Sequence, residues 1–122
     1  MKFITTNFTP QNISIPMGVE DTEISIKRIT VKEFKEDVLK AKGDIKSAIR
    51  YSNVANIVSG ITGVTVEQST EPFRAEEGDV VYQVRVIGPR LDDNADKLGK
   101  DNKLQVYKIT YKRAIQSTKQ PK

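Results

Sequence analysis

Short runs in which apolar and polar residues alternate recur along the chain. Alternation with a period of two is typical of β-strands that bury one face. The clearest run is residues 79–87, which is rich in β-branched residues. In residues 23–29 the alternation places Ile24 and Ile26 on the face that we expect to be buried. The pattern predicts strands at residues 2–6, 23–29, 44–51, 79–87 and 104–111.

Two stretches instead have the spacing of amphipathic helices. Thr30 and Glu33 have the spacing of a capping box, which predicts that a helix begins here. A second helix is predicted at residues 53–62, with Ser52 as its N-cap. Glycine readily takes the left-handed conformation that ends a helix, so the two helices should end at Gly43 and Gly63. The predicted inward-facing residues are Phe34, Val38 and Ala41 in the first helix and Val54, Ile57, Val58 and Ile61 in the second.

This order of elements predicts a single α/β (α+β) domain, with a mixed β-sheet and about two helices packed on it. A length of 122 residues suits one domain. We expect the domain to cover residues 1–113 and residues 114–122 to form a flexible polar tail. The long loop at residues 7–18 is a candidate ligand lid or subunit contact. Because a small core gains from additional burial, we also expect a homo-oligomer, either a dimer or a higher form.

The composition excludes several kinds of chemistry. The chain has no histidine and no cysteine, so it lacks Ser-His and Cys-His nucleophiles, disulfides and the usual zinc ligands. Glycine-rich phosphate loops are absent as well. We therefore expect a binding protein rather than an enzyme, with no cofactor and no metal. The lack of disulfides, of a signal-peptide run and of a spanning segment predicts a cytoplasmic protein without a membrane partner.

The charge distribution favours an anionic partner. Twenty basic and 16 acidic residues give a net charge of +4, and part of this excess lies near the C-terminal tail, so we do not expect nucleic acid to be the partner. Arg28 shares the face of Ile24 and Ile26, where a buried guanidinium would need a carboxylate, a phosphate or an exit to solvent. Gln83 and Arg85 share the polar face of strand 79–87, and Tyr82, Val84 and Val86 form its opposite, apolar face. Arg50 precedes a predicted helix N-terminus, where an anion is favoured.

Each of these residues also has a simpler interpretation. Any one arginine could form a surface or intersubunit ion pair with one of the 16 acidic residues. Tyr51 and Tyr82 could stack on a base, but aromatic residues are more often part of the core. The carboxylate pairs could act as acid and base or hold a cation, although each is more simply a solvated turn. These pairs are Glu76-Glu77 and Asp92-Asp93.

Several short motifs occur in an order that resembles the viral anti-CRISPR ring nucleases. They are Thr6-Asn7-Phe8-Thr9, Ser-Ala-Ile-Arg-Tyr at residues 47–51, Gly78-Asp79 and Arg90-Leu91-Asp92-Asp93. The length and the opening Phe-Ile-Thr-Thr-Asn-Phe at residues 3–8 more closely resemble the phage Thoeris anti-defence proteins.

The two resemblances imply different activities. Ring nucleases are dimers that enclose cyclic tetra-adenylate and cleave it with a histidine as general acid. Here the corresponding residue is Tyr51, and a phenol with a pKa of about 10 is a poor proton donor near neutral pH. Thoeris anti-defence proteins instead sequester cyclic ADP-ribose isomers made by TIR enzymes, without degrading them. The missing histidine agrees with this second activity.

The leading hypothesis is therefore a phage protein that binds and sequesters a cyclic nucleotide immune signal in the host bacterial cytoplasm. One alternative is a ring nuclease that cleaves a cyclic oligoadenylate with Tyr51 or an acidic residue, and another is a small DNA- or protein-binding accessory factor. In the leading hypothesis arginines bind the phosphates, tyrosines stack on the adenine and asparagines contact polar edges. The candidate ligand-binding residues are Asn7, Arg28, Arg50, Tyr51, Tyr82, Arg85, Arg90 and Asn94.

Overall fold

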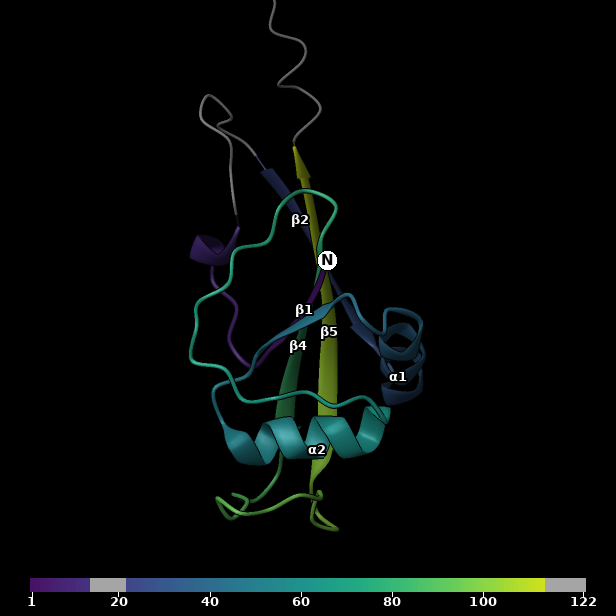
Figure 1. Ribbon diagram of the computed structural model, residues 1–122, viewed down its shortest axis with the longest axis vertical. Helices are drawn as coiled ribbons and strands as arrows, with labels where there is room; N and C mark the ends of the chain where they lie inside the picture. The colour runs from purple at the N-terminus through teal and green to yellow at the C-terminus, as the bar shows by residue number, and fades with distance from the viewer. Residues whose placement is uncertain (14–21, 114–122) are drawn as a thin grey trace, which may run out of the picture.

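The computed structural model describes residues 1–13 and 22–113 (Figure 1). Within these residues the chain forms five strands, two α-helices and one short 3₁₀ helix. Two predicted segments lie outside the described residues: the tail at residues 114–122, and residues 14–18 of the predicted loop. The elements are β1 (Lys2–Thr5), η1 (Pro10–Asn12), β2 (Thr22–Ile29), α1 (Val31–Lys40), β3 (Ile45–Ala48), α2 (Ser52–Thr62), β4 (Val80–Ile87) and β5 (Lys103–Arg113).

The strands form one mixed sheet in the order β2-β5-β4-β1-β3. The central strand β1 is parallel to both of its neighbours, β3 and β4. On the other side, β5 is antiparallel to both β4 and β2. The predicted fold class, a mixed sheet with two helices in one small α+β domain, is confirmed. β2 and β3 are the two edges of the sheet.

Both helices begin close to the predicted positions, but α1 ends at Lys40 with Ala41 as its C-cap, before the predicted end at Gly43. The Thr30 side chain accepts a hydrogen bond from the Glu33 N–H, and the Glu33 carboxylate accepts one from the Thr30 N–H, so the predicted capping box is present. Gly63 ends α2 with a φ of 77°, as predicted. The prediction of Ser52 as N-cap is wrong, because the cap is Tyr51, whose side chain makes no capping hydrogen bond.

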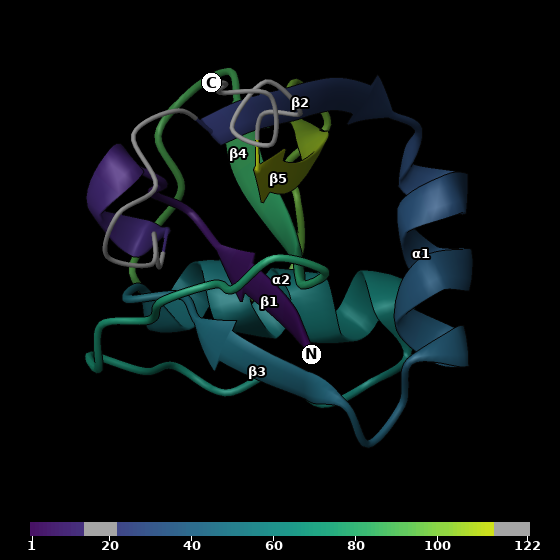
Figure 2. The same cartoon turned by 90° about the horizontal axis from the view of Figure 1, so that it is seen from above.

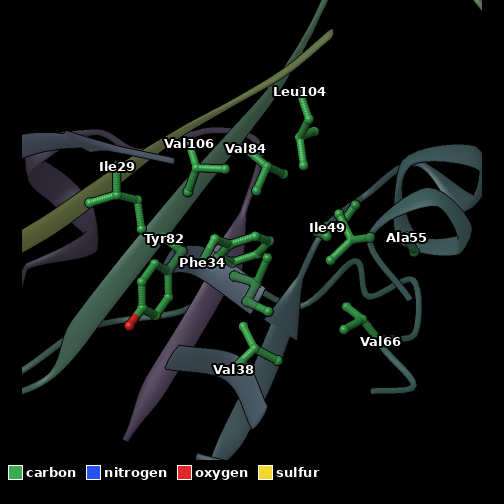
Figure 3. Close-up of a cluster of buried hydrophobic side chains, with 12 residues drawn as sticks. Ile29, Phe34, Val38, Ile49, Ala55, Val66, Tyr82, Val84, Leu104 and Val106 are labelled. Atoms are coloured by element: carbon green, nitrogen blue, oxygen red, sulfur yellow. The ribbon is translucent and has the colours of Figure 1, made fainter. Parts of the chain in front are cut away.

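The two helices pack on the same face of the sheet, which we call the helix face. Phe34 and Val38 of α1 are fully buried there against Tyr82 (Figure 3). The rings of Phe34 and Tyr82 lie 5.4 Å apart at an angle of 54°, a geometry typical of stabilising aromatic pairs. The predicted apolar side of β4 is therefore confirmed. This core is formed by Ile4, Ile29, Phe34, Val38, Ile49, Ala55, Val58, Val66, Tyr82, Val84, Leu104 and Val106.

Among the described residues, the opposite face of the sheet is covered only in part, by η1 and irregular segments rather than by α-helices. Phe73, from the connection between α2 and β4, stacks on Phe3 of β1 at 5.1 Å. Ile13, just after η1, joins the same cluster. Figure 2 shows η1 on one side of the sheet and α1 on the other. We call this side the loop face.

One face of β2 differs from the prediction. Ile24 and Ile26 are 41% and 63% exposed, and Arg28 is exposed beside them. The buried residue of this strand is Ile29, on the opposite face toward α1. The prediction failed because β2 is an edge strand, and no described segment covers the loop face at its position.

Within the described residues, no helix is long and apolar enough to cross a membrane.

Candidate functional site

The carboxyl ends of the parallel strands β1 and β3 border a polar pocket of about 240 Å³, which we call the strand-end pocket. In open sheets with parallel strands, ligands bind beside such carboxyl ends. Asn7 and Arg50, two of the predicted ligand-binding residues, both line this pocket. Its other lining residues are Thr5, Thr6, Thr9, Gln11, Asn12, Ala48, Glu71, Pro72 and Phe73.

Thr5 fixes the turn that carries Asn7 into the pocket. Its hydroxyl is buried, lies 2.9 Å from the Asn7 carbonyl oxygen and accepts a hydrogen bond from the Asn7 N–H at 3.1 Å. The same hydroxyl is 3.3 Å from the Ala48 carbonyl oxygen on β3. The side chain therefore links the ends of both strands, and the floor of the pocket is held in place without a ligand.

The far wall of the pocket is also fixed by hydrogen bonds. The Asn12 side chain donates to the Phe73 carbonyl oxygen at 3.0 Å and accepts from the Thr9 N–H at 2.8 Å. Gln68 donates to the Arg50 carbonyl oxygen at 2.6 Å. These contacts hold the connection between α2 and β4 against the strand ends and the segment that follows β1.

Arg50 is exposed, and within the described residues its guanidinium has no ion-pair partner at 4.0 Å or less. The one carboxylate in the pocket lining is Glu71. An unpaired arginine beside hydroxyl and amide groups suits an anionic ligand, because guanidinium binds phosphate or carboxylate oxygens through two parallel hydrogen bonds.

The pocket continues onto the uncovered part of the loop face. Gln83 of β4 donates to the Thr6 carbonyl oxygen at 3.5 Å, at the border of the pocket. Across the sheet Gln83 is paired with Tyr107 of β5, and Tyr107 is paired with Arg28 of β2. Arg85 is paired with the next residue on this face, Gln105. Directly paired residues have Cβ atoms about 4.5–5.5 Å apart, so these side chains form one polar surface.

Arg28 and Arg85 are both exposed on this polar surface. Neither guanidinium makes a hydrogen bond or an ion pair within the described part of the chain. The prediction that Gln83 and Arg85 share the polar face of β4 is confirmed by the register. Of the three options predicted for Arg28, the structure shows the exit to solvent, because its side chain is exposed on the edge strand.

Tyr51 and Arg90 lie elsewhere, at a second hollow of about 310 Å³ on the helix side of the sheet end. Tyr51 is 62% exposed. The Arg90 guanidinium is 3.9 Å from the Asp93 carboxylate, and both side chains are almost fully exposed. An exposed ion pair of this kind contributes little stability, so Arg90 can turn toward a ligand at small cost. The hollow is also lined by Asn53, Val54, Val86, Gly88, Pro89 and Leu91.

The structure contradicts the prediction of Tyr82 as a ligand-stacking residue. Its ring is fully buried in the core of the helix face. Its hydroxyl donates to the Asp37 carboxylate at 2.8 Å, and Lys108 donates to the same carboxylate at 3.1 Å. Burial and this hydrogen bond raise the pKa of Tyr82 far above its ordinary value. Tyr82 therefore anchors α1 to the sheet.

The eight predicted ligand-binding residues are thus not gathered at one place. Asn7 and Arg50 share the strand-end pocket, Arg28 and Arg85 share the polar surface next to it, and Tyr51 and Arg90 share the second hollow. Asn94 is exposed in the loop between β4 and β5 and lines neither cavity.

Sequence reasoning missed Thr5, Tyr107 and Gln105 as members of the site. A sign of Tyr107 was present, since residues 104–111 alternate and place Gln105 and Tyr107 on one side of the strand. No comparable sign marked Thr5, because its importance comes from contacts with a distant strand. In the described residues, no group of three or more acidic side chains is placed to hold a metal ion.

The STIV B116-like family model matches residues 6–112. The chain belongs to this family. Among solved structures it is similar to B116 of Sulfolobus turreted icosahedral virus, with a TM-score of 0.69 and 19% identity over 89% of this chain and 97% of that one. At this identity the likeness establishes the fold alone. No curated protein matches the chain significantly.

Proposed function

We propose that this chain is a viral accessory protein that binds a cyclic nucleotide immune signal in the host bacterial cytoplasm and withholds it without degrading it. Membership of a family named after a viral protein supports the viral role. The observation that carries the binding role is the unpaired Arg50 beside Asn7 in a pocket at the ends of parallel strands. The adjoining polar surface adds Arg28 and Arg85, which have no partner within the described residues.

A cyclic ADP-ribose isomer has the chemistry that this arrangement suits. Its diphosphate can be bound by Arg50, or by Arg85 and Arg28 if the ligand extends across the polar surface. Tyr107 is paired with Arg28 and lies diagonal to Arg85, and it offers a ring on which a base can stack. It replaces Tyr82 in this role.

Binding without cleavage is proposed because the chain lacks the side chains that such cleavage ordinarily uses. It has no histidine. Tyr51 lies in the second hollow rather than in the strand-end pocket. It is therefore not beside the phosphates that Arg50 is proposed to bind. Glu71 is the one carboxylate in the pocket lining. Among the described residues, its backbone N–H forms a hydrogen bond and its carboxylate forms none. A proton-transfer role for Glu71 is the rival to test.

The direct test is to incubate the protein with cyclic ADP-ribose isomers and with cyclic tetra-adenylate, isolate the complex, and analyse the nucleotide released by heating. Intact nucleotide supports the proposal, and linear product identifies a nuclease. Nucleotide absent from the isolated protein would remove the proposal in favour of a DNA- or protein-binding factor. Thermal shift provides a second readout, since a ligand at 100 times its dissociation constant stabilises by about 2.7 kcal/mol.

Two matched variants decide which cavity is used. Arg50→Ala should weaken binding about 10- to 100-fold, because a charge-assisted contact contributes about 1.5–3 kcal/mol. Arg90→Ala should leave the affinity almost unchanged. The reverse result in calorimetric titration would place the ligand in the second hollow with Tyr51.

A further inference from the structure

Glu71 is a carboxylate in a pocket that otherwise suits an anion. Its side chain is exposed and lines the strand-end pocket together with Arg50. The two side chains do not form an ion pair, because no described carboxylate lies within 4.0 Å of the Arg50 guanidinium. A negative charge beside a bound phosphate weakens binding by repulsion, unless the carboxylate binds another part of the same ligand.

The chain holds Glu71 in place from both sides. Before it, the Ser69 N–H donates to the Ile49 carbonyl oxygen at 2.8 Å, and the Glu71 N–H donates to the Ser69 hydroxyl at 3.3 Å. After it, Pro72 restricts the Glu71 backbone to extended conformations, and the next residue, Phe73, is buried. The carboxylate therefore lies at the pocket on a short span whose two ends are fixed.

Several polar side chains of the pocket are already used within the fold. The hydroxyls of Thr5 and Thr9 and the side chain of Asn12 take part in hydrogen bonds that hold the pocket walls. The side chains of Arg50 and Glu71 make no hydrogen bond with any other part of the described chain. A guanidinium only donates hydrogen bonds, and an ionised carboxylate only accepts them. The pocket therefore suits a ligand in which hydroxyl donors lie next to an anion.

The size of the pocket limits which part of a nucleotide enters it. At about 240 Å³, the pocket is smaller than the roughly 300–1,000 Å³ of pockets that enclose a whole small ligand. A ribose with one phosphate combines an anion with neighbouring hydroxyl groups. In dinucleotide-binding α/β domains, an Asp or Glu accepts a hydrogen bond from the ribose 2′-hydroxyl, so a carboxylate is a known kind of ribose-binding group.

We propose that Glu71 recognises ribose: its two carboxylate oxygens accept hydrogen bonds from a vicinal diol, while Arg50 binds the adjacent phosphate. This inference rests on the function proposed above and narrows its ligand class. A cyclic ADP-ribose isomer linked through the 2′- or 3′-oxygen of its adenosine keeps the 2″,3″-diol of its second ribose. A 3′,5′-linked cyclic oligoadenylate has no vicinal diol, because each of its 3′-oxygens is esterified. The pocket should therefore prefer a cyclic ADP-ribose isomer to cyclic tetra-adenylate.

A matched pair of ligands isolates the diol. In such an isomer, periodate cleaves the bond between the two hydroxyl-bearing carbons of the second ribose, and borohydride then reduces the aldehydes. The diphosphate and the adenine are retained in this diol-cleaved form. The wild type should bind the intact isomer about tenfold or more tightly than the diol-cleaved form, because hydrogen bonds to a charged group are among the stronger ones.

Glu71→Gln keeps the shape of the side chain and removes its charge. The variant should bind the intact isomer about tenfold less tightly than the wild type. Its affinity for the diol-cleaved form should be unchanged or higher, since the charge that repels the phosphate is gone. Glu67→Gln, at an exposed position beside β3, is the matched control and should keep the preference of the wild type. Calorimetric titration measures both ligands on all three proteins.

The possible outcomes separate this inference from the proposed function. If Glu71→Gln binds the intact isomer as tightly as the wild type or more tightly, the role of Glu71 is overturned and the proposed function stands. An equal loss of affinity for both ligand forms also overturns it, because the carboxylate then contacts a group other than the diol. A linear product that Glu71→Gln no longer forms would show proton transfer instead.

If the wild type binds neither ligand form, the inference and the proposed function both fail. Circular dichroism of each variant separates loss of binding from loss of folding.

Discussion

The two faces of the sheet are covered to different extents and by different kinds of segment. On the helix face, α1 and α2 cover strands β1, β4 and β5 with a continuous core. On the loop face, η1 and the connection that carries Phe73 cover one part, and no other described segment covers the polar surface with Arg28 and Arg85. Regular elements thus supply a closed core, and irregular segments border the pocket that contains Asn7 and Arg50. Loops held on a rigid scaffold are where binding residues are most often found.

The largest expected effect is in the core of the helix face. Phe34→Ala should reduce the free energy of unfolding by about 3–5 kcal/mol, because it opens a cavity against the buried Tyr82 ring. Phe73→Ala on the loop face should cost less and should loosen its own segment first. Urea unfolding measures the first effect, and hydrogen exchange measures the second. Equal global losses in both variants would mean that the two faces form one cooperative core.

The next largest effect is expected at Asp37, which links α1 to the sheet. Burial raises the pKa of Asp37, but the hydrogen bonds from Tyr82 and Lys108 outweigh it, and the net pKa is lowered. A carboxyl whose folded pKa is lowered contributes stability above its unfolded pKa of about 3.9, and this is lost as pH falls through the folded value.

Asp37→Asn should therefore reduce stability by about 1–3 kcal/mol at pH 7, and the difference from the wild type should shrink below about pH 4. Urea unfolding at several pH values measures this. The control is Asp96→Asn, at an exposed position in the loop between β4 and β5. A difference that is constant with pH would show that the charge of Asp37 is not the cause.

A smaller effect is expected where the loop face is anchored. Asn12→Ala removes the hydrogen bonds to the Phe73 carbonyl oxygen and from the Thr9 N–H, which should cost about 1–2 kcal/mol. Hydrogen exchange should rise near Phe73 before it rises in α1. Gln11→Ala, at the exposed neighbouring position, should change neither.

The same contrast explains what could be predicted from the sequence. The helix face was predictable because periodicity is local: the capping box at Thr30 and the stripe of Phe34 and Val38 were both identified correctly. The position of Tyr82 on the apolar side of β4 was predicted too, although it was also proposed as a ligand-stacking residue, which its burial contradicts.

The loop face was not predictable in the same way, because its contacts join residues far apart in the chain. Thr5 contacts Ala48, and Asn12 contacts Phe73. The exposure of Ile24 depends on which strand forms the sheet edge, and alternation within β2 cannot show this. The sequence therefore predicted candidate ligand-binding residues but not which of them lie together. The structure brings Asn7 and Arg50 together at one pocket.

The smallest expected effect on folding is on the open part of the loop face. Arg85 is exposed and has no partner in the described chain, so Arg85→Ala should change the free energy of unfolding by no more than about 0.5 kcal/mol. Its effect on ligand binding should be much larger if the nucleotide extends onto the polar surface, with affinity for a cyclic ADP-ribose isomer falling about 10- to 100-fold.

Arg85→Lys should recover part of this loss, because lysine keeps the charge without the planar two-point contact. Calorimetric titration measures each variant, with Arg113→Ala at the far end of β5 as control. Wild-type affinity in Arg85→Ala together with lost binding in Arg113→Ala would move the site away from this surface.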